Sequence, residues 1–394
     1  MRSIKNKLRK ASLSIIATVL IGCAVLCVAV RIAEVAPDPS IDILAVEMTF
    51  PTGNAEYSGL ESSNDHQSDP TAGSLESDNE DSAVTAETSE VISKAENSKE
   101  TSKADSKNKT AEKDDFEAST PTDEEIKKYD DSHKDDEKYP VTEFTTTKGN
   151  QSYQNIQIKN ASSADIDIKA ELAGKLGFTI EDTDEPQVLI YHTHTSESFL
   201  KYDTGYFYEG FYPRTTDTSQ NVCAVGEEIA KQLNKAGIKT IHDTTVHDYP
   251  SYNGAYDRSL DTINDYLKKY PSIKVVLDIH RDGIGTDTAK SKPVFTVNGK
   301  KAAQVMILAG YNYDGSDEFS DWEYNLRFAL QIQNTASQMY PDMMRPIYFA
   351  DFMYNMNVNT GSLLIEIGAE SNTVEEVRYS GYLLGKVLCK TLKK

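Results

Sequence analysis

The sequence predicts an α/β protein whose mainly parallel, twisted sheet is flanked by helices and preceded by a single transmembrane helix and a disordered linker. Two observations predict the sheet. Short apolar runs typical of buried strands occur at 187–191, 273–280 and 363–368. Stretches with apolar residues at three- and four-residue spacing, as in helices, lie between these runs. Such alternation is typical of a parallel sheet that helices cover on both faces.

The N-terminus predicts a membrane anchor. Residues 1–10 are basic, and residues 11–30 carry no charge before Arg31. A helix of about 20 residues spans a hydrocarbon core of roughly 30 Å, and a basic flank favours the cytoplasmic side. We therefore expect a cytoplasmic tail at 1–10 and a transmembrane signal-anchor at 11–31. This places the protein in the cell membrane as a single-pass protein, with its globular part outside the cytoplasm.

Residues 32–150 are expected to form a disordered acidic linker. The stretch 51–150 holds 26 acidic and 11 basic residues, a net charge of −15 out of −21 for the whole chain. Its apolar content is too low to offset the entropy that ordering would cost. Strong acidity without a basic patch also argues against nucleic acid as a partner.

The four cysteines, at positions 23, 27, 223 and 389, predict neither a zinc ribbon nor a disulfide framework, because no CxxC or paired spacing occurs. One alternative concerns the anchor. Residues 20–23 (LIGC) resemble a bacterial lipobox, which would place a lipid on Cys23. The apolar stretch continues past this cysteine, which argues against a lipid anchor.

The elements expected from 151 to 394 alternate along the chain. In the helix expected at 219–236, apolar residues recur three and four positions apart, and Gly237 follows as a helix stop. Asn298-Gly299 predicts a β-hairpin between 293–296 and 304–309. The other strands are expected at 156–158, 166–168, 238–242 and 347–350, and the other helices at 256–269, 321–339 and 374–392.

The segment directly after the first buried strand carries the strongest functional signal. Residues 191–199 read YHTHTSESF and offer His192, His194 and Glu197. His194 and Glu197 stand one helical turn apart. Zinc accepts nitrogen and carboxylate ligands at about 2.0–2.2 Å, so this segment predicts a metal site.

Two further polar residues lie in apolar strands. His280 ends the second buried run, and Glu366 lies inside the third. A carboxylate in an apolar strand is costly unless it is paired or functional, and sites in open α/β sheets gather outside the carboxyl ends of strands. We therefore expect a metal ion held by His280, Glu197 and either His194 or His192. Glu366 would take a proton from water at the open metal position.

Each of these residues alone has a simpler interpretation. A lone histidine at a strand end often packs or caps, and Asp278 could merely orient His280. Glu197 could cap the following segment. His242 and His247 are expected to be surface residues. Only the combination favours a metal hydrolase.

Four stretches carry a resemblance to a known family: 188–199 (VLIYHTHTSESF), 278–282 (DIHRD), 363–368 (LLIEIG) and 372–376 (NTVEE). They resemble the stage II sporulation protein P family of endospore-forming Firmicutes over about 150–394, together with the anchor-and-linker layout. That family is similar to zinc N-acetylmuramoyl-L-alanine amidases, which have an α/β fold with a twisted sheet. The expected catalytic domain is therefore 151–394.

The resemblance implies a function. It implies Zn²⁺ as cofactor and cleavage of peptidoglycan at the amide between stem peptide and glycan, with stem cross-link cleavage also attributed to the family. It further implies action in forespore engulfment, at the engulfing membrane of the mother cell. The implied partners are stage II sporulation proteins D and M.

The resemblance also implies metal ligands in the first histidine pair and at His280, with Glu366 as the catalytic glutamate. The third ligand stays open. Zinc amidases place a glutamate at the start of the following helix, which corresponds to Glu227, whereas zinc carboxypeptidases use a His-x-x-Glu pair, whose glutamate corresponds to Glu197. We favour Glu197 as the third metal ligand. His192 would then contact a metal ligand or the substrate.

Substrate contacts are expected from arginines and aromatic residues. Arg281 or Arg214 would pair with stem-peptide carboxylates through bidentate geometry, although Arg281 could instead serve a structural ion pair. The aromatic segment 202–212 would form a hydrophobic lid or a groove where sugar faces stack. Two other functions remain open: a non-catalytic scaffold that binds the wall, and a zinc peptidase that acts on stem peptides only.

Overall fold

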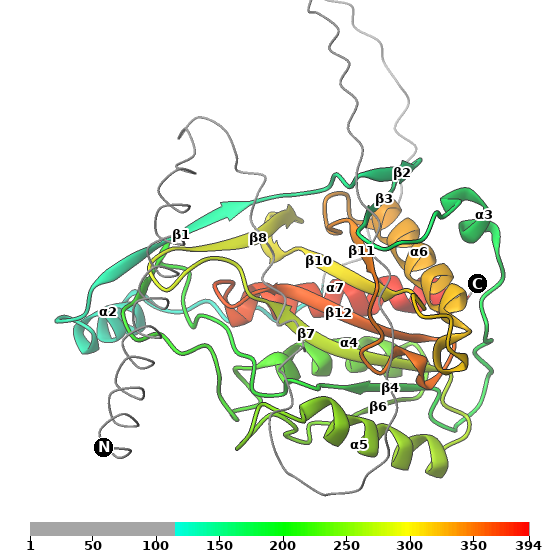
Figure 1. Ribbon diagram of the computed structural model, residues 1–394. Helices are drawn as coiled ribbons and strands as arrows, with labels where there is room; N and C mark the ends of the chain where they lie inside the picture. Colours follow the sequence, from blue (N-terminus) through cyan, green and yellow to red (C-terminus); the bar gives the residue numbers. More distant parts are fainter. Residues whose placement is uncertain (1–114, 394) are drawn as a thin grey trace, which may run out of the picture. The chain divides into compact units, whose positions relative to one another are not determined.

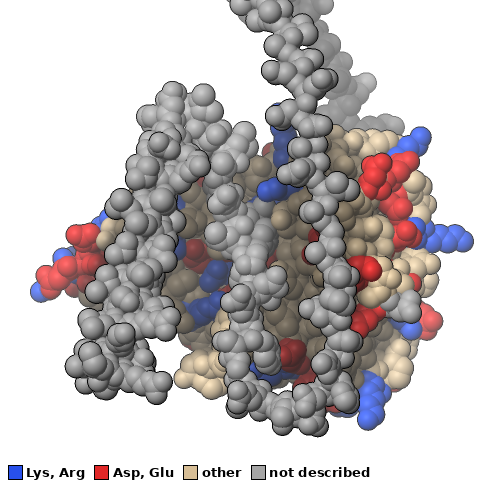
Figure 2. All heavy atoms as spheres, in the orientation of Figure 1, with Lys and Arg blue, Asp and Glu red and all other residues tan. Residues whose placement is uncertain are grey.

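The computed structural model describes residues 115–393 (Figure 1). The expected cytoplasmic tail, the transmembrane span and the linker up to residue 114 lie outside these residues. Within 115–393, no helix combines the length and apolar character needed to cross a membrane. The described residues form a mixed α/β fold with two sheets. On the face drawn in Figure 2, acidic and basic side chains are intermixed where described residues are visible.

The larger sheet has eight strands in the order β2-β3-β11-β10-β12-β7-β4-β6. Neighbouring strands are parallel except in the pairs β2–β3 and β10–β12. The expected mainly parallel sheet is therefore confirmed. Its strands are β2 (Gln151–Tyr153), β3 (Ile156–Asn160), β4 (Val188–Tyr191), β6 (Thr240–His242), β7 (Val275–Asp282), β10 (Val305–Gly310), β11 (Ile347–Ala350) and β12 (Ser362–Ala369).

Helices cover both faces of this sheet. On one face, α4, α6 and α7 bury alternate strand residues such as Ile190 and Ile279 in the main core. On the other face, α5 packs through Ile263 against Leu189, and Figure 1 shows it beside β4 and β6. The helices are α3 (Ile168–Ala173), α4 (Val222–Lys235), α5 (Ala255–Lys269), α6 (Trp322–Met339) and α7 (Val374–Leu392), with short 3-10 helices η1 (Asp317–Phe319) and η2 (Met356–Val358).

A second sheet of four strands, in the order β5-β1-β8-β9, was not predicted. The hairpin within it turns at Asn298 and Gly299, whose φ angles are 53° and 75°, as the Asn-Gly signal predicts. The chain leaves this sheet at Gln304, so the run expected as the second hairpin strand belongs to the larger sheet. The strands are β1 (Lys138–Phe144), β5 (Tyr206–Tyr208), β8 (Lys290–Val297) and β9 (Lys300–Ala303).

Two further sequence-based expectations are wrong: disorder in the C-terminal part of the expected linker, and a strand at 166–168. The expected linker 32–150 contains a helix, α2 (Asp123–Ser132), as well as β1. A capping box between Thr122 and Glu125 starts α2, and pairing with β5 and β8 orders β1. The run 166–168 is not a strand, because the Asp167 side chain accepts a hydrogen bond from the Ala170 backbone and starts α3 there.

Candidate metal and catalytic site

The strand order brings the candidate residues to one edge of the sheet. β4, β7 and β12 are adjacent and parallel, so their carboxyl ends meet there. In the register of β12 with β7, Glu366 lies directly opposite His280. The loop after β4 carries His194 and Glu197 to the same edge.

His194, Glu197 and His280 form a buried cluster. Glu197 Oε1 lies 3.4 Å from His194 Nδ1, and Glu197 Oε2 lies 3.5 Å from His280 Nδ1. A backbone hydrogen bond of 3.0 Å from the amide of Glu197 to the carbonyl of His194 closes the turn that aligns these two side chains. Two imidazoles and one carboxylate, with one atom from each lying within 4.8 Å of the others, make a donor set that fits zinc.

Opposite charges stabilise this cluster. Burial disfavours a charge on Glu197, but hydrogen bonds with His194 and His280 hold its pKa well below the usual range. Burial also disfavours a charged His280, yet Asp278 and Glu197 raise its pKa well above the usual value. Metal binding would therefore have to displace a proton from His280.

Asp278 supports His280 from behind. Its Oδ1 atom lies 2.8 Å from His280 Nε2, although the two groups are not aligned as a hydrogen bond. The carboxylate is itself fixed by Thr193, whose backbone amide and hydroxyl donate to it at 2.8 and 2.7 Å. A carboxylate behind an imidazole orients a histidine toward a metal ion and raises its basicity. The orienting role considered for Asp278 therefore fits a ligand role for His280.

Glu366 has a buried carboxylate oxygen without a hydrogen-bond partner among the described residues. Its side chain is buried, and among the described residues no group hydrogen-bonds to Oε2. Burial, with a contribution from Asp282, raises its pKa to about 8, against the opposing charge of His280. A carboxylate with a pKa near neutrality is suited to accept and release protons.

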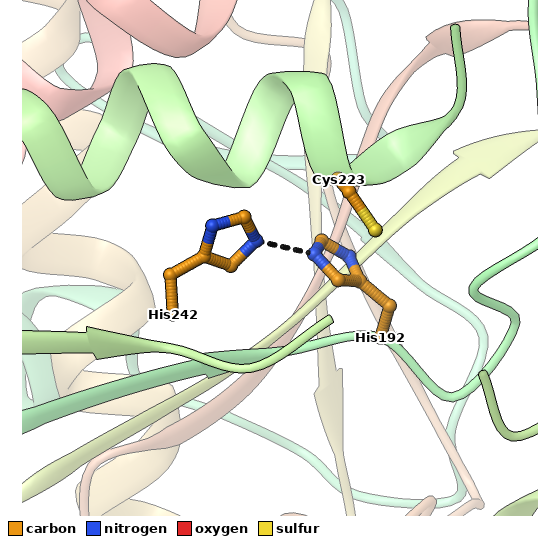
Figure 3. A group of neighbouring side chains, drawn as sticks. All are labelled: His192, Cys223 and His242. Atoms are coloured by element: carbon orange, nitrogen blue, oxygen red, sulfur yellow. Dashed lines mark hydrogen bonds between the residues drawn. The ribbon is translucent and has the colours of Figure 1, made fainter. Parts of the chain in front are cut away.

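His192 does not join this cluster. Its Nε2 lies 2.9 Å from Nε2 of His242, and Cys223 completes a separate group (Figure 3). Burial lowers the pKa of His192 to about 3, and burial raises the pKa of the Cys223 thiol to about 12. Glu227 lies at this second group, where Oε2 is 3.3 Å from His242 Nδ1, so the geometry favours Glu197 as the ligand beside His194.

The expectation that His242 and His247 are surface residues is wrong. The side chain of His242 is only 8% exposed, because α4 covers it. His247 is buried and hydrogen-bonds to the carbonyl of His192 and the hydroxyl of Thr262. Sequence alone missed both because their burial depends on tertiary packing: α4 folds back over His242, and His247 bonds to the chain at His192.

The two arginines differ in their surroundings. The side chain of Arg281 is only 8% exposed. Its backbone amide donates to Glu197 Oε2 at 3.2 Å, and its guanidinium donates to the carbonyl of Pro213. This favours the structural alternative for Arg281. Arg214 is about a quarter exposed. It pairs with Asp248 at 2.8 Å, and its Nη2 atom lies 3.9 Å from Glu197 Oε1.

Arg214 lines a groove of about 700 Å³ beside the cluster. Its guanidinium lies 4.9 Å from the ring centre of Tyr252, and that ring stacks on His194 at 4.5 Å. Tyr212 of the aromatic segment also lines this groove and is 73% exposed. The rest of that segment is no lid, because Tyr208 lies in β5 and bonds to Asp130 of α2.

Three tyrosines at the site were missed by sequence reasoning. Tyr252 stacks on His194, and Tyr256 meets the same ring edge-on at 5.4 Å. Tyr354 stacks on Tyr256 at 5.2 Å from a loop where its φ is 42°. The four-residue spacing of Tyr252, just before α5, and Tyr256, in its first turn, was the available signal, whereas nothing in the sequence marks Tyr354.

These features define a mixed α/β protein with a His–Glu–His cluster of metal-binding type beside a buried glutamate. The model of the stage II sporulation protein P (SpoIIP) family matches residues 54–389. The chain belongs to this family. Stage II sporulation protein P of Bacillus subtilis (strain 168) is 26% identical over 206 residues, which cover 50% of this chain and 48% of that protein. The chain thus matches about half the length of this relative.

Solved structures with a similar arrangement include amidases. The CwlD amidase of Clostridioides difficile, in complex with the GerS lipoprotein, has a TM-score of 0.31 at 12% identity over 52% of this chain and 98% of that one. An N-acetylmuramoyl-L-alanine amidase from Clostridium difficile 630 also has a TM-score of 0.31. It is 18% identical, and the match covers 54% of this chain and 96% of that one.

Proposed function

We propose that this protein is a zinc-dependent peptidoglycan hydrolase, an N-acetylmuramoyl-L-alanine amidase that acts in forespore engulfment during sporulation. One observation carries the proposal: the buried Glu366 lies directly opposite His280, in register, at the edge where His194 and Glu197 complete a metal-binding set. Membership of the stage II sporulation protein P family supports the biological setting.

The residues divide into three roles. His194, Glu197 and His280 would hold the zinc ion, and Asp278 would orient His280. Bound zinc supplies a Lewis acid for the scissile carbonyl and lowers the pKa of water. Glu366 accepts the water proton at Oε2 and passes it to the leaving amine, as its raised pKa allows.

Substrate binding is proposed for the groove beside the cluster. Arg214 offers a guanidinium to a stem-peptide carboxylate while Asp248 fixes its orientation. Tyr212, which is 73% exposed, presents an aromatic face along the same groove, which suits a sugar ring. Arg281 then acts through Glu197 rather than through the substrate.

The location and partners are proposals as well. A signal-anchor at 11–31 would hold the catalytic domain outside the cytoplasm in the engulfing membrane, and the stretch 32–114 would tether it there. Stage II sporulation proteins D and M are the proposed partners, through the family. The same site could also cleave stem peptides as an endopeptidase, in addition to or in place of the amidase reaction.

The proposal is tested on purified peptidoglycan with the full chain, wild type and Glu366→Gln, with and without a chelator. Products are separated and identified by mass. Free stem peptides with denuded glycan, lost in the variant and on chelation, are the expected result. Cleavage between stem residues only would make the protein a peptidase, and wall binding without any released product would make it a scaffold.

A further inference from the structure

A second group of metal-binding side chains lies apart from the proposed catalytic cluster. His192 follows β4, Cys223 lies in the first turn of α4 and His242 ends β6. Figure 3 shows the two rings meeting at their ring nitrogens, with the thiol of Cys223 directed toward His192. One ligand atom from each of the three lies within 4.8 Å of the others.

The hydrogen bonds of the two rings determine which nitrogen carries a proton. His192 Nδ1 lies 2.8 Å from the carbonyl oxygen of Ile279, which can only accept, so Nδ1 donates. His242 Nδ1 lies 3.3 Å from a carboxylate oxygen of Glu227, so this nitrogen donates as well. In the neutral rings, both Nε2 atoms therefore carry lone pairs.

These two lone pairs face each other at 2.9 Å. Such a contact is unfavourable unless a cation or a shared proton lies between the nitrogens. Ligand nitrogens at 2.0–2.1 Å from a tetrahedral zinc ion are about 3.3 Å apart, close to the separation found here. Each ring also has an oxygen acceptor behind it, the arrangement that orients metal-binding histidines.

Cys223 gives the group its chemical preference. The residue is 1% exposed and forms no disulfide. A set of two imidazoles and one thiolate suits zinc and other borderline or soft d-block cations and disfavours Mg²⁺ and Ca²⁺. The sulfur would bind as a thiolate, because a bound metal ion deprotonates its thiol ligand.

The packing of α4 is adapted to this close approach. A Cβ atom on Gly226 would lie 2.6 Å from His242 Nε2 and 2.9 Å from His192 Nε2. Only glycine therefore lets the helix approach the two rings this closely. A cavity of about 620 Å³, lined by Cys223, His242 and Glu227 among others, borders the group.

We propose that His192, Cys223 and His242 bind a second d-block cation, such as zinc, at a site separate from the catalytic cluster. Because His192 is held by the carbonyl of Ile279, next to His280, this cation would fix the loop after β4 against β7. The site would thus position the His194 segment rather than take part in the reaction.

Cobalt is the probe for this site, because a thiolate ligand gives Co²⁺ a charge-transfer band in the near ultraviolet. The full chain is stripped with a chelator and titrated with Co²⁺. The wild type and Cys389→Ser, the matched control, should show the band. Cys223→Ser should lose it, and Glu197→Gln should keep it because that change affects only the proposed catalytic cluster.

Metal content gives the second readout. After zinc loading and removal of excess, the wild type should hold one more zinc ion per chain than Cys223→Ser and His242→Ala. Circular dichroism establishes that each variant is folded. A wild type without the thiolate band, or a zinc content unchanged in both variants, would overturn the proposal and leave two rings that share a proton. Neither the cobalt band nor the zinc content depends on hydrolase activity. A failure of this second metal site can therefore be told apart from a failure of the proposed function.

Discussion

Glu366 and His280 lie opposite each other in the parallel pairing of β12 with β7, each buried at the carboxyl edge of the sheet. His280 belongs to the His194–Glu197–His280 cluster of metal-binding type. Glu366 has a carboxylate oxygen, Oε2, without a hydrogen-bond donor among the described residues. The backbone register thus fixes the distance between the proposed base and the proposed metal. Rigid strands hold such a geometry more closely than loops do.

Replacement of the proposed base should remove activity and leave metal binding intact. Glu366→Gln keeps the size of the side chain but cannot accept a proton, so kcat on peptidoglycan should fall by about 10²–10⁴-fold. Zinc content should stay at the wild-type level. A variant with more than a tenth of the wild-type rate would exclude Glu366 as the base.

The same variant should stabilise the metal-free protein, in a pH-dependent manner. The pKa of Glu366 is about 8 when folded, against an ordinary value of 4.5, so the folded state binds the proton more tightly. Stability contributed by this group is therefore present at low pH and is lost as pH rises from about 4.5 through 8. Glu366→Gln should add about 2–4 kcal/mol to the free energy of unfolding at pH 8.5 and little near pH 4.5. Denaturant unfolding in the presence of a chelator measures the free energy of unfolding at both pH values. An equal effect of the substitution at the two pH values would contradict a raised pKa of Glu366 as its cause.

Loss of the carboxylate behind His280 should weaken zinc binding. Asp278→Asn removes the charge that orients His280, so zinc affinity should fall by about 10–100-fold. Thr193→Val removes one of the two hydrogen bonds that fix this carboxylate and should have a smaller effect in the same direction. Competition with a chromophoric chelator measures both affinities. Equal affinities in Asp278→Asn and the wild type would mean that His280 is no ligand.

The choice of third ligand is testable by substitution at Glu197. Glu197→Gln should lower zinc affinity at the catalytic cluster by at least about 100-fold, because the carboxylate lies between both histidines. Glu376→Gln is the matched control, since Glu376 is a buried carboxylate that is paired with Lys292 and does not belong to the His194–Glu197–His280 cluster. The control should lose stability but bind zinc normally. Normal zinc binding by Glu197→Gln would return the choice to Glu227.

Arg214 should act on substrate binding rather than on the metal. Arg214→Lys keeps the charge but loses the bidentate geometry, so KM should rise by about tenfold or more while kcat and zinc content change little. Kinetics on a soluble muropeptide with a free carboxylate separate the two constants. An effect on kcat alone would assign Arg214 to the reaction and not to binding.

Much of the larger sheet and of the candidate site follows from local sequence signals. Apolar runs and helical spacing identify β4, β7, β12 and α7, because the pattern of burial is written directly into these segments. The pairing of Glu197 with His194 also follows from a three-residue spacing. These signals act over short distances in the chain.

The features that the sequence did not reveal depend on long-range contacts. β1 gains its order from strands far along the chain, and the acidic composition around it conceals this. His192 and His194 belong to different clusters because His192 contacts His242, which is fifty positions away in the chain. Tyr354 reaches the site on a loop whose conformation no residue pattern marks.

The most direct test of the account is hydrolysis of peptidoglycan in ¹⁸O-labelled water by the zinc-loaded full chain. Cleavage of the amide between glycan and stem should place the label in the lactyl carboxylate of the glycan and leave the stem peptide unlabelled. The label should be absent with Glu366→Gln. Label in stem-peptide carboxylates only, or equal labelling by the variant, would contradict an amidase in which Glu366 activates the water.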